Sequence, residues 1–318
     1  TPISRGCFLN YPYRCFDPDV FGFAPDEIAN MDPQQRLILE VAWEALEIAG
    51  IPPAHLSGSK TGVYMGGFTT DFLLSQFSVQ ARSSLGRHSA AGSTLTMLSN
   101  RLSYALDLHG PSVTIDTACA SSLSALSIAV RDLQAGLCPT ALVGGVNFML
   151  RPEYQIGMSA ANLLAIDGRS KPFSALADGY GRGEGCGVLV LKPLSAAQRD
   201  GDTLWAVIAA AGTGHDGRTA GISLPNGEAQ RNLMRQVLDQ AALTPDAVGY
   251  VEAHGTGTPQ GDPVEAQSIA AVYGRGRQGA MPFGSLKANI GHLEAAAGVA
   301  GVIKAVLMLH ARQIPPHL

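Results

Sequence analysis

Apolar runs with little alternation between apolar and polar residues are the feature that most restricts the fold of this chain. Residues 141–150 (ALVGGVNFML) and 187–191 (GVLVL) are of this kind. Such runs suit strands that are buried on both faces, as in sheets covered by helices. A helical pattern follows a different rule: Asp32-Pro33 is a good helix start, and Gly50 closes a stretch in which apolar residues recur at every fourth position. The chain therefore combines buried strands with amphipathic helices.

Strand-like and helical patterns alternate along the whole chain, which favours a layered α/β fold. Besides the two runs above, we expect strands at residues 61–65, 112–116, 204–211, 248–252 and 283–287, and helices at 32–50, 95–106, 117–136, 227–242 and 295–310. A polar connection at 192–202 separates two halves with a similar order of elements. We predict two units, residues 1–195 and 196–318, which pack as one body.

Composition excludes several classes of protein. Hydrophobic residues make up 46% of the chain and charged residues 15%, a balance that is incompatible with intrinsic disorder. The net charge of −4 gives no basic footprint for nucleic acid. The longest apolar stretch, residues 295–309, is interrupted by Lys304 and falls short of the roughly 18 residues of a membrane span. We therefore expect neither a nucleic-acid partner nor a membrane segment.

The cysteines indicate a reducing compartment. There are five of them, and none forms a CxxC pair. A disulfide framework or a cysteine-based zinc site is not expected from this pattern. We predict a cytoplasmic protein with room for a reactive thiol.

The segment DTACASS, residues 116–122, holds the first candidate for chemistry. A strand is expected to end at Asp116 and a helix to begin within the next few residues. A cysteine at a helix N-terminus is closer to the thiolate form, because the helix dipole can lower the thiol pKa to about 7. Cys119 is therefore a candidate nucleophile. The alternative is a buried structural cysteine, the common case for a free thiol.

Two further polar segments follow apolar strands. In VEAHGTGTP, residues 251–259, His254 opens a Gly/Thr loop that carries Thr256 and Thr258. Glycines allow close backbone approach to a ligand and threonines offer hydroxyl groups, although a simple turn with an exposed histidine is the alternative. The following Gly261-Asp262-Pro263 is interpreted as an ordinary turn.

The third segment, SLKANIGH at residues 285–292, places Lys287 and His292 before a Gly/Ala-rich helix. A helix-capping loop with an incidental lysine and histidine is the alternative. Cys119, His254 and His292 have the side-chain types of a zinc site, but no local ligand spacing supports one. We predict no metal.

These motifs together resemble the β-ketoacyl synthase domains of modular type I polyketide synthases. DTACASS, EAHGTGTPQGDPVEAQ and SLKANIGHLEAAAGVAG occur in the family's order, and ADGYGRGEGCGVLVLKPLS lies between the first two. The resemblance covers essentially the whole chain. It implies a thiolase-like fold, with two related α/β halves in five layers, α-β-α-β-α, and a homodimer.

The resemblance also implies an activity, decarboxylative Claisen condensation. Cys119 matches the nucleophile that accepts an acyl chain. His254 and His292 match the two histidines that serve decarboxylation and condensation, and Lys287 matches a lysine that supports the site by charge and hydrogen bonding. The implied transferase takes its extender, a malonyl-type thioester, from an acyl carrier protein.

Thr256 and Thr258 match the threonines that hydrogen-bond the phosphopantetheine arm of the carrier. The resemblance thus implies substrates carried on phosphopantetheine, no directly bound cofactor, and two partners, the carrier protein domain and an acyltransferase domain of the same polypeptide. Ala120 stands where a serine is common. The family's first strand and its final glycine-rich segment have no counterpart, so we expect a domain truncated at both ends.

Two other functions are compatible with parts of this pattern. A catalytically silent, acyl-binding or structural relative, especially as a truncated fragment, is one; such relatives usually lack the cysteine or the first histidine, and both are present here. A cysteine hydrolase is the other, and it would need a third residue to orient a single Cys–His pair.

Overall fold

A four-stranded sheet forms the centre of the first half of the molecule. The computed structural model describes residues 3–318, and the sheet has the order β2-β1-β3-β4. Its strands are β1 (Gly62–Gly66), β2 (Ser112–Ile115), β3 (Ala141–Asn147) and β4 (Gly185–Leu191). β1 is parallel to β2 and β3, whereas β4 is antiparallel to β3. β1 and β3 are buried along their whole length, whereas β4, which contains the run 187–191, is only partly buried after Val188. The expected burial on both faces is therefore found in β3 and only in part in β4.

Helices cover both faces of this sheet. α3 (Pro33–Ile48) and α6 (Met97–Ala105) pack on one face, and α7 (Ser121–Gln134) and α13 (Ala297–Ala311) on the other. The start of α3 is capped as predicted, because the Asp32 side chain accepts the backbone N–H of Gln34 at 2.9 Å.

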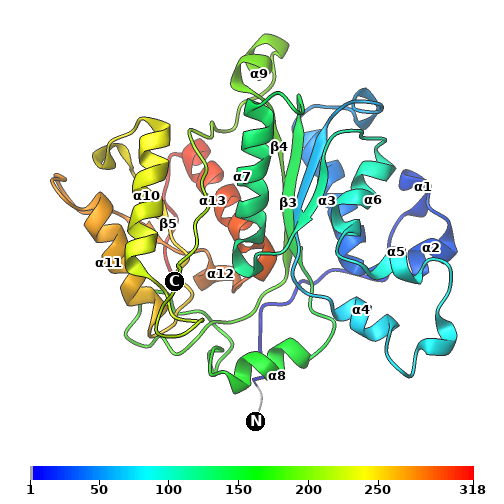
Figure 1. The fold of residues 1–318 in the computed structure, drawn as a ribbon, viewed down its shortest axis with the longest axis horizontal. Helices are drawn as coiled ribbons and strands as arrows, with labels where there is room; N and C mark the ends of the chain where they lie inside the picture. Colours follow the sequence, from blue (N-terminus) through cyan, green and yellow to red (C-terminus); the bar gives the residue numbers. More distant parts are fainter. Residues whose placement is uncertain (1–2) are drawn as a thin grey trace.

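The second half adds a smaller sheet and an outer helix pair. β5 (Val251–Glu252) and β6 (Phe283–Gly284) pair in parallel, and α10 (Gly227–Ala241) packs against α11 (Gly261–Tyr273). Figure 1 shows the order across the molecule: α10 and α11, then β5, then α13 and α7, then the four-stranded sheet, then α3 and α6. These are the five alternating layers that the resemblance implies.

Short helices complete the chain, and most of them lie in the connections. They are α1 (Pro18–Phe21), α2 (Pro25–Ala29), α4 (Asp71–Gln76), α5 (Ser89–Ser93), α8 (Glu153–Ala160), α9 (Leu194–Asp200) and α12 (Lys287–Ile290), with the 3-10 turns η1 (Pro53–His55), η2 (Arg82–Ser84), η3 (Ala118–Ala120), η4 (Pro245–Ala247) and η5 (Glu294–Ala296). The predicted boundary between the halves falls inside α9. The division into 1–195 and 196–318 stays a prediction.

The prediction of a strand at residues 204–211 is wrong. The segment is apolar, but Leu204 is 46% exposed and Val207 60%, and within residues 3–318 no backbone hydrogen bond joins it to a neighbouring strand. An extended chain becomes a strand only when a partner satisfies its backbone groups, and the small sheet of this half pairs only two residues per strand. A run of apolar residues predicts burial better than it predicts pairing.

Helix α13 and the 3-10 turn η5 before it form one continuous helical stretch. The stretch Glu294–Ala311 has 18 residues and a mean hydropathy of 1.4, and by length and composition alone it could cross a membrane. It is the one such helix in the described part of the chain, and the prediction that this stretch is too short is therefore wrong. In the structure the helix packs against α7 and β4, and its first residue forms a buried ion pair.

Candidate active site

Cys119 lies in a tight turn between β2 and α7, not in the first turn of the helix itself. Ala118, the residue before it, has φ 51°, a left-handed conformation that is uncommon outside glycine. The Asp116 carboxylate accepts the Ala118 N–H at 2.9 Å, and the Ser121 hydroxyl donates to the Ala118 carbonyl at 2.6 Å. These two bonds hold the turn and fix the position of the cysteine.

Small residues allow the elements behind Cys119 to approach closely. A Cβ atom on Gly66 of β1 would lie 2.6 Å from the Ser122 nitrogen, and one on Gly145 of β3 would lie 2.8 Å from the Ala295 carbonyl oxygen. The Ser122 hydroxyl accepts the N–H of Val299 at 3.0 Å and so ties α7 to α13. The turn that carries Cys119 therefore lies where the four-stranded sheet meets helices α7 and α13.

The expected lowering of the Cys119 pKa is wrong. Burial first, and the Glu294 carboxylate second, raise the pKa of the Cys119 thiol to about 11, and the Lys287 charge offsets only part of this. A helix dipole contributes about 0.3–1 kcal/mol, which is less than one pKa unit at about 1.4 kcal/mol per unit. In this site desolvation outweighs the dipole, and the resting cysteine is a neutral thiol.

His254 follows β5, and its backbone is held from two sides. Its N–H donates to the Glu265 carboxylate at 2.6 Å, and the N–H of Gly255 donates to the other oxygen of that carboxylate at 2.7 Å. The Lys287 ammonium group, which is almost fully buried, donates to the His254 carbonyl at 2.6 Å. Glu265 on α11 and Lys287 on α12 therefore position this histidine through its main chain.

The Gly/Thr loop is organised by Asp262, which is 4% exposed. One carboxylate oxygen accepts the N–H groups of Gly257 at 3.1 Å and Thr258 at 3.3 Å, and the other accepts the Phe173 N–H at 2.6 Å. The hydroxyl groups of Thr256 and Thr258 lie 3.2 Å apart. The interpretation of Asp262 as part of an ordinary turn is wrong, because it shapes the loop and opens helix α11.

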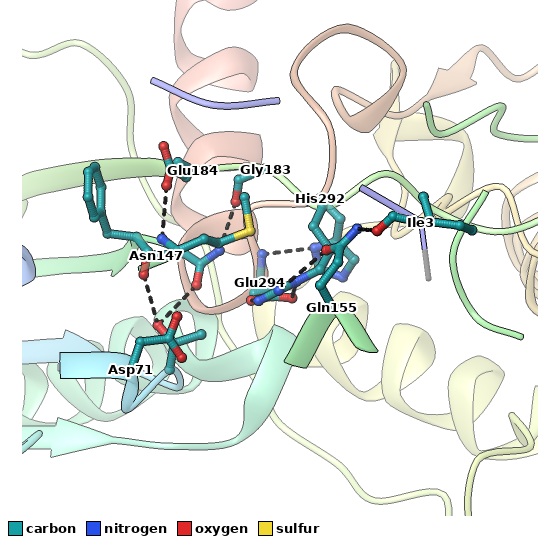
Figure 2. A network of polar contacts seen from close by, with 12 residues as sticks. Ile3, Asp71, Asn147, Gln155, Gly183, Glu184, His292 and Glu294 are labelled. Atoms are coloured by element: carbon teal, nitrogen blue, oxygen red, sulfur yellow. Dashed lines mark hydrogen bonds and ion pairs between the residues drawn. The ribbon is translucent and has the colours of Figure 1, made fainter. Parts of the chain in front are cut away.

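His292 is 1% exposed and is bonded through both its backbone and its ring. Its N–H donates to the Gly181 carbonyl at 2.7 Å, and its carbonyl accepts the Gly183 N–H at 2.8 Å. The ring Nδ1 accepts the backbone N–H of Glu294 at 3.0 Å, as Figure 2 shows. Because Nδ1 accepts, the proton of the neutral ring resides on Nε2. Nε2 is buried without a hydrogen-bond partner among residues 3–318, so an N–H donor is held ready in the site.

The rings of His254 and His292 lie close together in an edge-to-face arrangement. Their centroids are 5.5 Å apart and their planes meet at 84°. Burial first, then the charge of Lys287, lowers the pKa of His292 well below its usual value. The same two causes lower the pKa of His254, although by its solvent-accessible surface that residue is exposed. Both rings are therefore neutral at pH 7, and the cation near them is Lys287.

The structure brings together the residues that the sequence singled out. Cys119 lies within reach of the charges of Lys287 and Glu294, and Lys287 contacts His254, which faces His292. Across residues 3–318 no group of three His, Cys, Asp or Glu side chains is arranged to hold a metal ion.

Sequence reasoning missed the residues that position this group. Asp262 and Glu265 lie three residues apart in GDPVEAQ and so on one face of a helix; this spacing was the available signal. Arg182 and Glu294 form a buried ion pair. They are distant in the chain, and no local sequence pattern indicates that they are in contact.

Comparisons with known proteins agree with this geometry. The family model described as "Beta-ketoacyl synthase, N-terminal domain" matches residues 1–197, and "Beta-ketoacyl synthase, C-terminal domain" matches residues 205–318. Together they cover nearly the whole chain.

Curated relatives are polyketide synthases. The chain is 48% identical over 320 residues to the spectinabilin polyketide synthase system protein NorC of Streptomyces orinoci. This alignment covers 100% of the chain and 14% of the relative. It is 46% identical over 318 residues to 5-methyl-1-naphthoate synthase of Streptomyces sahachiroi, which covers 99% of the chain and 18% of that protein. The chain thus spans less than a fifth of the length of these relatives.

Solved ketosynthases have the same fold. The oxazolomycin ketosynthase domain OzmH KS7 of Streptomyces albus JA3453 superposes with a TM-score of 0.92 at 38% identity, over 98% of this chain and 55% of that one. The ketosynthase from module 6 of the Bacillus subtilis 168 bacillaene synthase gives 0.86 at 36% identity, over 96% and 52%. The thiolase-like fold inferred from the sequence is confirmed, and the chain belongs to the β-ketoacyl synthase family.

Proposed function

We propose that this chain catalyses decarboxylative Claisen condensation in polyketide biosynthesis, joining an acyl group held on Cys119 to a malonyl-type extender on an acyl carrier protein. The observation that carries the proposal is the buried Nε2–H of His292, which has no hydrogen-bond partner among residues 3–318 and belongs to a ring whose centroid lies 5.5 Å from that of His254. An oxyanion that develops in this space would meet neutral N–H donors.

In the first step, the Cys119 sulfur attacks the carbonyl carbon of an acyl thioester. A new C–S bond forms, the bond to the incoming carrier sulfur breaks, and the proton of the Cys119 thiol ends on the released carrier thiol. Since burial raises the pKa of the thiol to about 11, proton removal accompanies attack. The charge of Lys287 offsets part of the cost of forming the thiolate.

In the second step, the malonyl-type thioester loses its carboxylate as carbon dioxide. The electrons of the broken C–C bond move to the thioester carbonyl, and an enolate oxygen develops. His292 Nε2–H and a ring N–H of His254 donate to this oxygen; one such donor is typically worth about 3–4 kcal/mol of barrier in a dry site. A neutral donor suits this task because it needs no desolvated positive charge.

In the third step, the enolate carbon attacks the acyl carbonyl on Cys119. A C–C bond forms, the C–S bond to Cys119 breaks, and the β-ketoacyl chain remains on the carrier. The sulfur leaves as the thiolate, which regains a proton before the next cycle.

The loop after β5 suits a carrier-bound substrate. Thr256 and Thr258 present hydroxyl groups from a loop whose glycines permit close approach, and we propose that they bind the phosphopantetheine arm. The partners we propose are an acyl carrier protein domain, an acyltransferase domain of the same polypeptide and a second copy of this chain. The five free thiols fit a cytoplasmic protein.

The hydrolase alternative loses support at His292. A base in a hydrolytic triad is oriented by a side chain at its second ring nitrogen, whereas His292 Nδ1 receives a backbone N–H. Cys119 and both histidines are present and assembled, and no structural observation favours the silent alternative.

The test is intact-protein mass spectrometry after incubation with a simple acyl thioester, with Cys119→Ala as the control. We expect a single acyl adduct on the native chain and none on the variant. A malonyl thioester added to the loaded protein should then release carbon dioxide and β-ketoacyl product. Folded protein that never acquires an adduct would overturn the proposal in favour of a silent acyl-binding domain.

A further inference from the structure

A buried ion pair lies directly behind His292. The Arg182 guanidinium group is bidentate on the Glu294 carboxylate, with Nε to Oε1 at 2.6 Å and Nη2 to Oε2 at 2.9 Å. Arg182 is 1% exposed and Glu294 is 2% exposed. Such a pair is geometrically strict, because two parallel hydrogen bonds fix both the distance and the orientation of the two groups.

The Glu294 backbone has an unusual conformation with a clear purpose. Its φ is 46°, in the left-handed region that residues with a side chain seldom adopt. In this conformation its N–H points at His292 Nδ1. The surroundings must hold the conformation, and Arg182 engages both oxygens of the Glu294 side chain.

Arg182 is itself part of the backbone frame around the histidine. The residues on each side of it, Gly181 and Gly183, bond to the His292 N–H and carbonyl, and its own carbonyl accepts the Cys7 N–H at 2.8 Å. The guanidinium carbon lies 5.8 Å from the centre of the Tyr154 ring. One three-residue segment therefore holds His292 by its main chain and Glu294 by its side chain.

We propose that Arg182 and Glu294 are a positioning pair that locks the backbone N–H of Glu294 onto His292 Nδ1 and thereby keeps the Nε2–H of His292 aimed into the site. This inference rests on the proposed function for its catalytic meaning, but not for its structural content. Neither residue touches the reacting atoms, and both act through His292.

The pair has a second effect on Cys119. The charged groups that act on this thiol are Glu294 on η5 and Lys287 on α12, and they act in opposite directions; the phenol of Tyr180 is a third, neutral group nearby. Replacement of the Glu294 carboxylate by an amide removes the negative charge that adds to the effect of burial on the Cys119 pKa. The thiol pKa should then fall, which gives a readout that a merely structural role would not move.

The first test uses the native protein and needs no substrate. Nitrogen-15 NMR of the histidine rings, with His292→Gln to assign the signal, should find His292 as the neutral Nε2–H tautomer between about pH 5 and 8, since its pKa is lowered. An Nδ1–H tautomer or a protonated ring in this range would overturn the proposal, whatever the variants do.

The second test compares three substitutions. Glu294→Ala removes the carboxylate that Arg182 binds, while residue 294 must still adopt a positive φ. Glu294→Gly removes the same carboxylate but adopts a positive φ readily. Glu294→Gln keeps the shape of the side chain without its charge. We expect decarboxylation to fall about 100-fold for Ala, in the range seen when one oxyanion donor is lost, and to be about tenfold better for Gly than for Ala. Wild-type rates in the Ala variant, or a Gly variant no better than Ala, would contradict the proposal.

The third readout is the pH profile of Cys119 alkylation by iodoacetamide. Glu294→Gln should react faster than the native chain at each pH between about 7 and 10, because its thiol pKa is lower. An unchanged profile counts against the pair as a determinant of the site. Alkylation and the tautomer need no condensation, so they can succeed where acyl loading fails, and the two proposals are thereby separated. If Ala and Gly do not fold, the Gln variant and the native tautomer decide.

Discussion

At the scale of single residues, the same two causes, burial and the charge of Lys287, keep both histidines neutral, but different contacts position them. The ring of His292 is set by the Glu294 N–H at Nδ1, whereas His254 is positioned through its backbone by Glu265 and Lys287. In the proposed mechanism each supplies a neutral N–H donor, and neither is needed to make Cys119 nucleophilic by ion pairing. Acyl loading and condensation should therefore be separable.

We predict that His254→Ala and His292→Ala leave acyl loading largely intact and slow condensation about 10²–10³-fold each, the effect of one lost oxyanion donor. Intact mass measures the loading, and carbon dioxide release measures the second step. Cys119→Ala is the control, since it should abolish loading altogether. Normal condensation in either histidine variant would contradict the two-histidine mechanism.

The sequence was sufficient to identify the reactive residues but not their charge states. Cys119, His254, Lys287 and His292 lie in local motifs, so their identities could be read directly. The pKa of Cys119 depends on burial and on Glu294, which come from the tertiary structure. The nearby helix end and a backbone hydrogen bond at Cys119 itself are local influences that lower this pKa, and burial outweighs them.

At the scale of elements, the site depends on how closely β1 approaches the start of α7. Gly66 provides this approach, because a Cβ there would lie 2.6 Å from the Ser122 nitrogen and 2.8 Å from the Ser121 carbonyl carbon. Both contacts are with backbone, which cannot swing aside as a side chain could. Any larger residue at this position must push α7 and the Cys119 turn outward.

We predict that Gly66→Ala destabilises the protein by about 1–3 kcal/mol, the usual effect of overpacking, and slows acyl loading in the protein that remains folded. Urea unfolding and intact mass measure the two effects. Gly157→Ala in α8 is the matched control, because a Cβ there meets nothing within 4 Å; it should leave stability unchanged or raise it by up to about 1 kcal/mol. Equal behaviour of the two variants would refute the packing argument.

Elements were predictable where local signals were strong. The helix at 33–48 has a proline start, a capping aspartate and a four-residue apolar repeat, and it was found to within two residues. Helix α11 was missed because Gly261-Asp262-Pro263 suggests a turn, whereas Asp262 bonds back to the preceding loop and the helix runs on. The strand at 204–211 failed because pairing is set by a partner strand, which a local pattern does not reveal.

At the scale of the whole molecule, buried acids should govern how stability responds to pH. Asp32, at the start of α3, is 3% exposed. Burial raises its pKa to about 6, against the opposing hydrogen bonds from Gln34. The native state thus binds this proton more tightly than the unfolded chain does, and Asp32 lowers the free energy of unfolding as pH rises from about 4 to about 6.

We predict that Asp32→Asn reduces this loss. Between about pH 4 and 6 the native chain should lose up to about 1.4 kcal/mol per pH unit relative to the variant, the limit for one proton. The asparagine oxygen can still accept the Gln34 N–H, so the helix cap is retained. Urea melts of both proteins at several pH values provide the measurement. Parallel stability curves would show that Asp32 does not titrate in this range.

The layered arrangement of the molecule could be predicted, because alternating elements and buried strands leave few ways to cover a sheet. Contacts between the halves could not. The Arg182–Glu294 pair and the bonds of Gly181 and Gly183 to His292 join segments that are far apart in the chain, and one sequence carries no signal for such pairs. The number and the order of the layers were predicted only through the resemblance to a known family; the residue patterns by themselves predicted a layered α/β fold.

The pairing of Gly181 and Gly183 with His292 also determines when the protein becomes competent during its synthesis. The Cys119 turn is built from residues that are synthesised before residues 181–183 and His292, and its hydrogen bonds are local. Gly181 and Gly183, which bond to the backbone of His292, are synthesised more than a hundred residues before His292 itself. In the proposed mechanism a nascent chain therefore carries the thiol without its oxyanion donors, and condensation requires that the segment around His292 pack against residues 181–183. We therefore expect turnover only after residues 181–183 and His292 are in contact.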